Sequence, residues 1–294
     1  KIKYSKMKKK KILIIGYSGG VAKEIYLQFK NDFKLKFLSR KKIDALKDYK
    51  NYNKEIIKFE PEIVINCIAM TGIKHCENHI DDAYFVNAKL PKLLSKYCYK
   101  IGAKFIHFST DAVFEGRIFK KKYSENSKSN PTTIYGKSKR MSEILLSKRK
   151  STIVIRIPLL YGPTQKKHLI FKLVSQLKDN KKVFASTDIY STPVYTPHLV
   201  RFIKEKIIEN DNFFKSKIKN NLINYSSNRY ISIYSLVKVF AKILKKEKNL
   251  IAVKDNFFDK NSNKPKYLGL KSTKKHFTDY DLKDCAKLFL KKIS

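Results

Sequence analysis

Apolar runs and amphipathic stretches alternate along the first half of the chain. Five runs have the continuous apolar character of strands buried on both faces, at 11–16, 35–39, 61–69, 103–109 and 151–157. A weaker run at 55–59 is a further strand candidate. Helical periodicity predicts helices over 23–29, 81–101 and 132–150. This alternation predicts an α/β fold, a doubly wound parallel sheet of the Rossmann type with helices on both faces.

After Pro158 the alternation weakens and the expected elements become shorter. Amphipathic periodicity predicts helices at 168–178, 196–210, 232–244 and 282–292, and short strands at 182–185 and 222–225. Two units are therefore expected: a sheet domain over 7–157, and a region over 158–294 that is mainly a smaller C-terminal lobe with some elements returning to the sheet. Residues 1–6, which precede Met7, are expected to lie outside the fold.

The first strand ends in a turn of small residues. Gly16, Gly19 and Ala22 recur every three residues, with Gly20 and Val21 between the last two. Such a turn lets the backbone approach a pyrophosphate and points the N-terminus of a helix at its charge. Similar turns also occur for packing reasons alone, so the interpretation depends on its place at the first strand. We expect 7–157 to bind NAD(P).

Tyr135 and Lys139 are four residues apart on a predicted helix. That spacing puts the phenol and the ammonium on one face, where the positive charge is expected to lower the pKa of the phenol. Upstream, a predicted strand ends in the hydroxyls of Ser109 and Thr110. The carboxyl ends of parallel strands meet at one edge of a sheet, where ligands bind. A hydroxyl, a Tyr and a Lys brought together there would form a hydride-transfer site.

The end of the second predicted strand indicates which cofactor is used. In dinucleotide folds an acidic residue there binds the adenosine ribose and repels a 2′-phosphate. Here Ser39 is followed by Arg40 and Lys41. A guanidinium can pair with the phosphate, and a lysine adds charge. NADPH is therefore expected, with NADH as the alternative.

The chain carries a net charge of +40, which would suit a nucleic-acid or membrane partner. Its lysines are spread over nearly every segment instead of forming one arm or stripe, so neither partner is expected. A basic surface does attract an anionic substrate. The four cysteines show no paired spacing, and we expect reduced cytosol as the location.

A histidine-rich stretch resembles a metal cluster. His75 and His79 are spaced to share a helix face beside Cys76 and Glu77. The stretch follows a strand that is expected to line the cofactor, which offers a role for these residues without a metal. No metal site is expected.

The sequence resembles an extended short-chain dehydrogenase/reductase, and more narrowly the dTDP-4-dehydrorhamnose reductase family. The resemblance is good over about 11–202 and loose beyond. It is carried by these stretches: Asn66-Cys-Ile-Ala-Met-Thr71, Glu77 with Val86-Asn87-Ala88, Phe108-Ser-Thr-Asp-Ala-Val-Phe-Glu-Gly116, Pro131-x-x-x-Tyr-Gly-Lys-Ser-Lys139 and Arg156-Ile-Pro-Leu-Leu-Tyr-Gly162.

The resemblance implies a role for each matching position. Thr110 would polarise the substrate carbonyl, with Ser109 as a stand-in that also borders the cofactor. Tyr135 would be the general acid, and Lys139 would hold the nicotinamide ribose. The remaining cofactor contacts implied are Gly16, Gly19, Gly20, Val21 and Ala22 at the pyrophosphate, Ala69 and Thr71 at the nicotinamide, and Asn87 as a brace. The substrate contacts implied are Asp111, Val113, Phe114, Arg156 and Lys264.

The resemblance implies NADPH-dependent reduction of a nucleotide-linked 4-keto-6-deoxy sugar for a surface polysaccharide. Two departures leave the sugar open: the chain has no Trp, and Lys264-Pro265 stands where Arg-Pro is expected. The alternatives are an epimerase of the same superfamily and a catalytically silent NADP-binding regulatory subunit. Dehydratases of this superfamily follow Thr-Asp with Glu, and Ala112 occupies that position here. A homodimer is compatible with the sequence.

Overall fold

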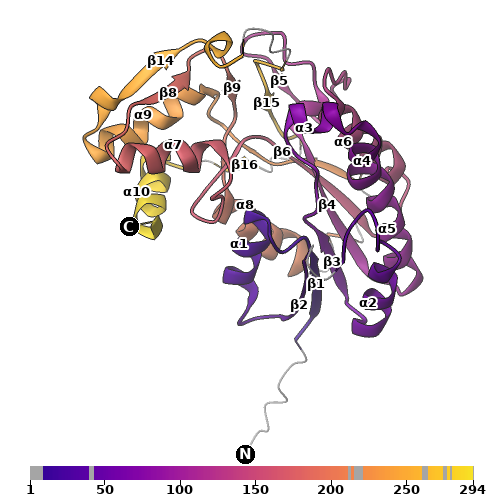
Figure 1. The fold of residues 1–294 in the computed structure, drawn as a ribbon. Coiled ribbons are helices and arrows are strands. Elements are labelled where there is room, and N and C mark those ends of the chain that lie inside the picture. Colours follow the sequence, from indigo (N-terminus) through magenta and orange to yellow (C-terminus); the bar gives the residue numbers. More distant parts are fainter. Residues whose placement is uncertain are drawn as a thin grey trace, which may run out of the picture.

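The computed structural model describes residues 9–39, 43–210, 213–214, 221–259, 264–273, 277–278 and 280–293, and it has two lobes (Figure 1). The larger lobe is built on a six-stranded sheet of order β11-β6-β4-β3-β1-β2 in which every pairing is parallel. The strands are β1 Lys11–Ile15, β2 Lys34–Leu38, β3 Ile63–Asn66, β4 Lys104–Thr110, β6 Thr152–Ile157 and β11 Leu222–Asn224. The predicted fold class is confirmed.

Helices cover both faces of this sheet. One face packs on α1 (Gly20–Phe29), α8 (Thr196–Phe202) and the π-helical η3 (Ile203–Ile208). The other face packs on α2 (Asn51–Phe59), α5 (Leu90–Lys100) and α6 (Ile134–Leu146). The inner strands β1, β3, β4 and β6 are buried on both faces, which is why they appear in the sequence as largely apolar runs.

The strand expected at 55–59 is wrong, because this stretch belongs to α2. Tyr52 and Ile56 are one helical turn apart and both are buried against the sheet, while the residues between them face outward. The helix carries the chain from β2 back across β1 to β3. A short segment with few apolar positions fits either periodicity, and tertiary packing decided between them.

The helix predicted at 81–101 is continuous but contains an irregular turn. It consists of α4 (Ile80–Tyr84), the π-helical η1 (Phe85–Lys89) and α5. Gly102 follows with φ +70°, the left-handed conformation that ends a helix. π-Helical turns are rare and occur often at functional sites. Here the wide turn contains Asn87, whose side chain reaches the sheet edge.

The smaller lobe has its own core. Helices α7 (Leu169–Lys178), α9 (Ile233–Leu244) and α10 (Leu282–Ile293) pack around the parallel pair β8 (Val183–Ser186) and β14 (Leu250–Val253). Although they come late in the sequence, β11 and α8 belong to the large lobe. The short paired strands are β5 (Lys122–Tyr123) with β15 (Gly269–Leu270), β7 (Leu160–Tyr161) with β10 (Val194–Tyr195), β9 (Tyr190–Ser191) with β13 (Ile231–Ser232) and β12 (Ser226–Ser227) with β16 (Phe277–Thr278).

Within the described residues, no helix is both long enough and apolar enough to cross a membrane.

Candidate active site at the carboxyl edge of the sheet

The glycine turn follows β1, at the point where the chain order of the sheet changes direction between β1 and β3. Gly16 has φ +94°, and a Cβ there would lie 2.9 Å from the backbone of Cys67. Only glycine allows the two strand ends to approach so closely. Gly19 precedes the first residue of α1 as its N-cap. The described geometry fits a dinucleotide pyrophosphate, because a tight turn presents the N-terminus of α1 at a topological switch point.

The next glycine, Gly20, is packed against a second loop. A Cβ on Gly20 would collide with the side-chain amide of Gln165, which is buried and bonds Thr196 at 3.1 Å. Ala22 is fully buried beneath the turn, and Val21 packs on the same core. These two residues therefore hold the turn in place, and the cofactor contacts expected of them stay predictions.

Asn87 braces the loop after β3. Its side chain accepts from the Met70 N–H at 2.9 Å, and its amide donates to the Met70 carbonyl and to Ser138 Oγ at 3.0 Å each. The loop is thereby tied to α6. Ala69 and Thr71, on either side of Met70, are exposed. Exposure at a strand end leaves them accessible to the expected nicotinamide.

Three local contacts fix the start of α6. Thr133 Oγ1 caps the helix by accepting from the Gly136 N–H at 3.1 Å, and the Glu77 carboxylate accepts from the Ile134 N–H at 2.8 Å. An acid at a helix N-terminus is also favoured by the helix dipole. Gly136 lies so close to the Ala112 carbonyl that a Cβ would collide with it. Tyr135 is thus held beside the end of β4.

Tyr135 and Thr110 meet at this edge, where the Thr110 hydroxyl influences the phenol. Burial raises the pKa of the Tyr135 phenol to about 12, and the nearby Asp111 charge also raises it, while the Thr110 hydroxyl lowers it. The lowered pKa that was expected for this phenol is therefore wrong for the described structure. Desolvation outweighs the neighbouring charge, so the phenol holds its proton.

Lys139 is buried one turn further along α6. Desolvation lowers the pKa of its ammonium to about 8, while the neighbouring Glu143 carboxylate and the Cys67 and Cys76 thiols raise it. Desolvation holds the pKa of the buried His107 imidazole far below its usual range, and the Lys139 charge lowers it further. Lys139 therefore titrates close to neutral pH.

Asp111 is bonded to Thr110, whose Oγ1 donates to Asp111 Oδ1 at 3.1 Å. Burial raises the pKa of this carboxyl to about 7, although hydrogen bonds to Thr110 and to backbone amides lower it. Asp111 orients the Thr110 hydroxyl. Its direct contact with substrate stays a prediction.

Ser109 points away from Thr110 into a buried ion pair. It donates to Glu143 Oε1 at 2.6 Å, and the same carboxylate accepts from Arg156 Nε and Nη2 at 2.7 Å each. Arg156 is 1% exposed and lies over the Phe114 ring. The Arg156 guanidinium and the Ser109 hydroxyl are thus both bonded to Glu143 in the protein interior. This favours a supporting role for the two residues instead of the predicted direct contacts.

Three other predicted substrate residues are also engaged within the protein. Val113 and Phe114 are fully buried in a small core with Tyr123 and Leu270, so this geometry does not support direct contact with a ligand. Lys264 pairs with Asp255 at 2.5 Å, which partly neutralises its charge. Arg40 and Lys41, expected at the 2′-phosphate, lie outside the described residues.

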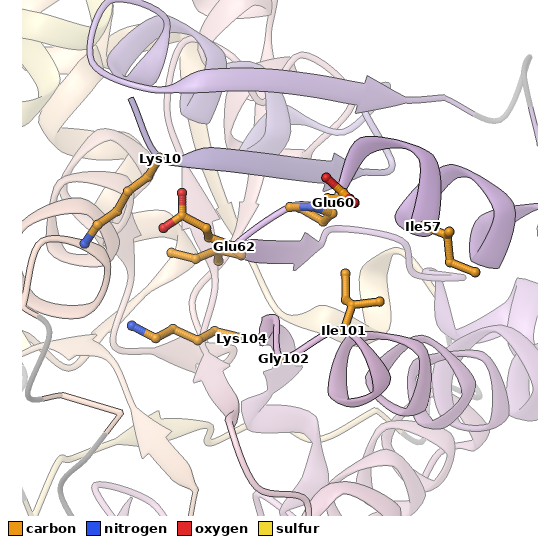
Figure 2. A pocket seen from close by; sticks show the side chains of 9 residues that line it. Lys10, Ile57, Glu60, Glu62, Ile101, Gly102 and Lys104 are labelled. Carbon is orange, nitrogen blue, oxygen red and sulfur yellow. The ribbon is translucent and has the colours of Figure 1, made fainter. Parts of the chain in front are cut away.

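A cavity of about 440 Å³ lies at the opposite edge of the sheet, where β1, β3 and β4 begin (Figure 2). In the close-up, Glu62 lies between the side chains of Lys10 and Lys104. Glu62 also accepts from the Lys11 N–H at 3.2 Å. The lining combines both charge signs and is largely exposed. Its lining contains none of the candidate site residues, so we place the active site at the carboxyl edge.

Glu143, the acceptor at the centre of the buried ion pair, was not predicted as a site residue from the sequence. One signal was present in the sequence: Glu143 follows Lys139 by four residues, on the helix face that carries the candidate chemistry. The structure also gives Glu77 a definite role as a cap of α6. Within the described residues, no three His, Cys, Asp or Glu side chains are placed to hold a metal ion.

The family model of the RmlD substrate binding domain matches residues 10–284. The chain belongs to this family. Among curated relatives, Spore coat polysaccharide biosynthesis protein SpsK of Bacillus subtilis is 28% identical over 194 residues, 66% of this chain and 68% of the relative. Methionine adenosyltransferase 2 subunit beta of Bos taurus is 29% identical over 166 residues, 53% of this chain and 49% of the relative. The chain spans about half the length of most curated relatives that it matches.

Solved structures match nearly the whole chain. A dTDP-4-dehydrorhamnose reductase from Clostridium acetobutylicum is 25% identical with a TM-score of 0.84, covering 96% of this chain and 99% of its own. A second, from Bacillus anthracis in complex with NADP, is 20% identical with a TM-score of 0.84, covering 97% and 99%. Other matching structures hold NAD. The Rossmann-type fold is common to all of them.

Proposed function

We propose that this RmlD-family protein is an NADPH-dependent reductase of a nucleotide-linked 4-keto-6-deoxy sugar, of the dTDP-4-dehydrorhamnose reductase type. The observation that carries the proposal is the convergence of Thr110, Tyr135 and Lys139 at the carboxyl edge of the sheet, beside the glycine turn. Relatives named as reductases of this type support it. The product would serve surface polysaccharide synthesis, as the name of SpsK suggests.

The residues at the site divide the chemistry between them. When bound, the nicotinamide supplies the hydride that reduces the sugar carbonyl carbon. The Tyr135 phenol would donate a hydrogen bond to the carbonyl oxygen, and the Thr110 hydroxyl would turn from Asp111 Oδ1 to donate to the same oxygen. Because burial keeps the pKa of Tyr135 high, its proton leaves only when that oxygen gains negative charge. The Lys139 ammonium, on the same helix face, would then stabilise the phenolate and hold the cofactor ribose.

NADPH should be preferred over NADH because of Arg40, with Lys41 adding charge. Arg40→Ala should raise the Kd for NADPH about tenfold or more and leave that for NADH nearly unchanged, since a charge-assisted hydrogen bond contributes about 1.5–3 kcal/mol. Titration of nicotinamide fluorescence with both cofactors measures this. Lys47→Ala, which removes an exposed lysine further along, is the control. Equal affinity of the unmodified protein for both cofactors would show that Arg40 does not contact the phosphate.

The proposed activity is tested by mixing the protein with NADPH and dTDP-4-keto-6-deoxyglucose, with and without a 3,5-epimerase, and following nicotinamide absorbance. A reductase consumes one NADPH for each sugar reduced and purifies largely free of cofactor. Copurified nicotinamide with turnover that consumes none would indicate the epimerase instead.

A catalytically silent regulatory subunit is the second candidate. It is favoured by the similarity to a protein named as a subunit of methionine adenosyltransferase 2. Such a subunit has no use for a Tyr135 placed beside Thr110, which favours the reductase. NADPH binding without turnover of any nucleotide-linked keto sugar would support the silent subunit.

A further inference from the structure

Glu143 accepts hydrogen bonds from three elements that meet below the candidate site. Its carboxylate, with 2% of the side chain exposed, accepts from Ser109 on β4, from Arg156 on β6 and from Arg140 on its own helix at 2.6–2.8 Å. Ser109 directly precedes Thr110 in the chain. The Glu143 carboxylate therefore ties α6 to the end of β4 that carries the Thr110 hydroxyl.

Glu143 also follows Lys139 by one turn of the same helix. Besides Glu143, three titratable groups interact electrostatically with the Lys139 ammonium. They are Cys67 and Cys76, which follow β3 in the chain, and His107 on β4. Burial keeps both thiols protonated by raising their pKa values, and keeps the imidazole neutral. Glu143 is thus the group in this set that carries a negative charge at neutral pH, because hydrogen bonds and the Arg156 charge lower its pKa against the effect of burial.

We infer that Glu143 is a positioning residue of this site: its carboxylate locks the Lys139 helix against β4 and β6 and keeps the Lys139 ammonium charged near neutral pH. The inference rests on the proposed function only for the use to which Lys139 is put. Without the carboxylate, desolvation of the buried Lys139 ammonium would no longer be opposed by the Glu143 charge, and its pKa would fall further. The charged lysine that the cofactor ribose and the phenolate require would then exist only at lower pH.

The test follows the titration of Lys139 without any ligand. Isotope-labelled lysine side chains are observed by NMR as pH is raised, and Lys139→Met identifies the signal that titrates well below the roughly 10.4 of exposed lysines. Glu143→Gln should lower the midpoint by about one pH unit, since an opposite charge at close range shifts a pKa by about that much or more. Glu143→Asp keeps the carboxylate but shortens the side chain by one methylene, which moves the charge further from Lys139. It should give a smaller shift of the midpoint in the same direction.

Glu125→Gln is the matched control, because Glu125 is also buried and accepts from Asn224, Ser272 and Thr273 outside the site. Glu125→Gln should lower the free energy of unfolding without changing the midpoint of the Lys139 titration. If Glu143 had a merely structural role, Glu143→Gln would also leave that midpoint unchanged. NADPH binding gives a second readout: Glu143→Gln should weaken it about fivefold at pH 8 and less than about twofold at pH 6.

An unchanged Lys139 midpoint in every folded Glu143 variant would overturn the inference. If Glu143→Gln does not fold, the shift in Glu143→Asp decides. Failure of the proposed function appears separately, as absence of sugar reduction by the unmodified protein, and leaves the ligand-free titration as it is.

Discussion

Tyr135→Phe loses nearly all reductase activity while its affinity for NADPH stays close to that of the unmodified protein. The ring still fills its place beside Thr110, but no proton is available for the carbonyl oxygen. General acid catalysis contributes about 10²–10⁴-fold, and we expect kcat to fall by that factor. Steady-state kinetics with a cofactor titration alongside measure both quantities.

Tyr123→Phe is the matched control for Tyr135→Phe, since Tyr123 is also buried but packs in the small core with Phe114 and Leu270. It should retain most of the activity. Comparable turnover in the Tyr135 variant would show that another group supplies the proton, and Asp111, which is bonded to Thr110, would be the first to examine.

The largest loss of stability is expected from Arg156→Met. The side chain is 1% exposed and donates two hydrogen bonds to Glu143. Removing one partner of a buried pair leaves the other charge uncompensated, which costs about 3–5 kcal/mol of the free energy of unfolding. Urea titration followed by circular dichroism measures the change.

Arg140→Met removes the third donor to Glu143, and that side chain is 36% exposed. Its loss should cost less than about 1 kcal/mol, because solvent screens a surface pair. Replacing both Glu143 and Arg156 by Met should recover part of the loss of the single variant, since no buried charge is then left alone. An Arg156→Met protein as stable as the unmodified one would mean that water reaches the Glu143 carboxylate.

Much of the large lobe could be predicted from local pattern. The four inner strands of its sheet are buried on both faces, so their sequence carries the signal whatever the helices do. The stretch at 55–59 misled because three apolar residues in five fit a strand as well as the buried face of α2. Strand β11, from the second half of the chain, was predicted as a strand, but only the topology places it in the main sheet.

The candidate site was less predictable than the fold. The positions of Thr110, Tyr135 and Lys139 follow from the end of a strand and the spacing along a helix, and both can be predicted from the sequence. Their electrostatics cannot, because burial decides the pKa of Tyr135 and depends on contacts between distant segments. Glu143 was missed for the same reason. A charged residue on a helix is usually solvated, and its partner Arg156 lies on the next strand.

Transfer of deuterium from NADPH labelled on its transferable hydrogen tests the central claim most directly. The unmodified protein is incubated with labelled NADPH and the nucleotide-linked 4-keto-6-deoxy sugar in ordinary water, and the product is analysed by mass spectrometry and NMR. The account predicts one deuterium on sugar carbon 4 for each NADPH oxidised. A product without deuterium, or no product at all while NADPH is bound, would contradict it.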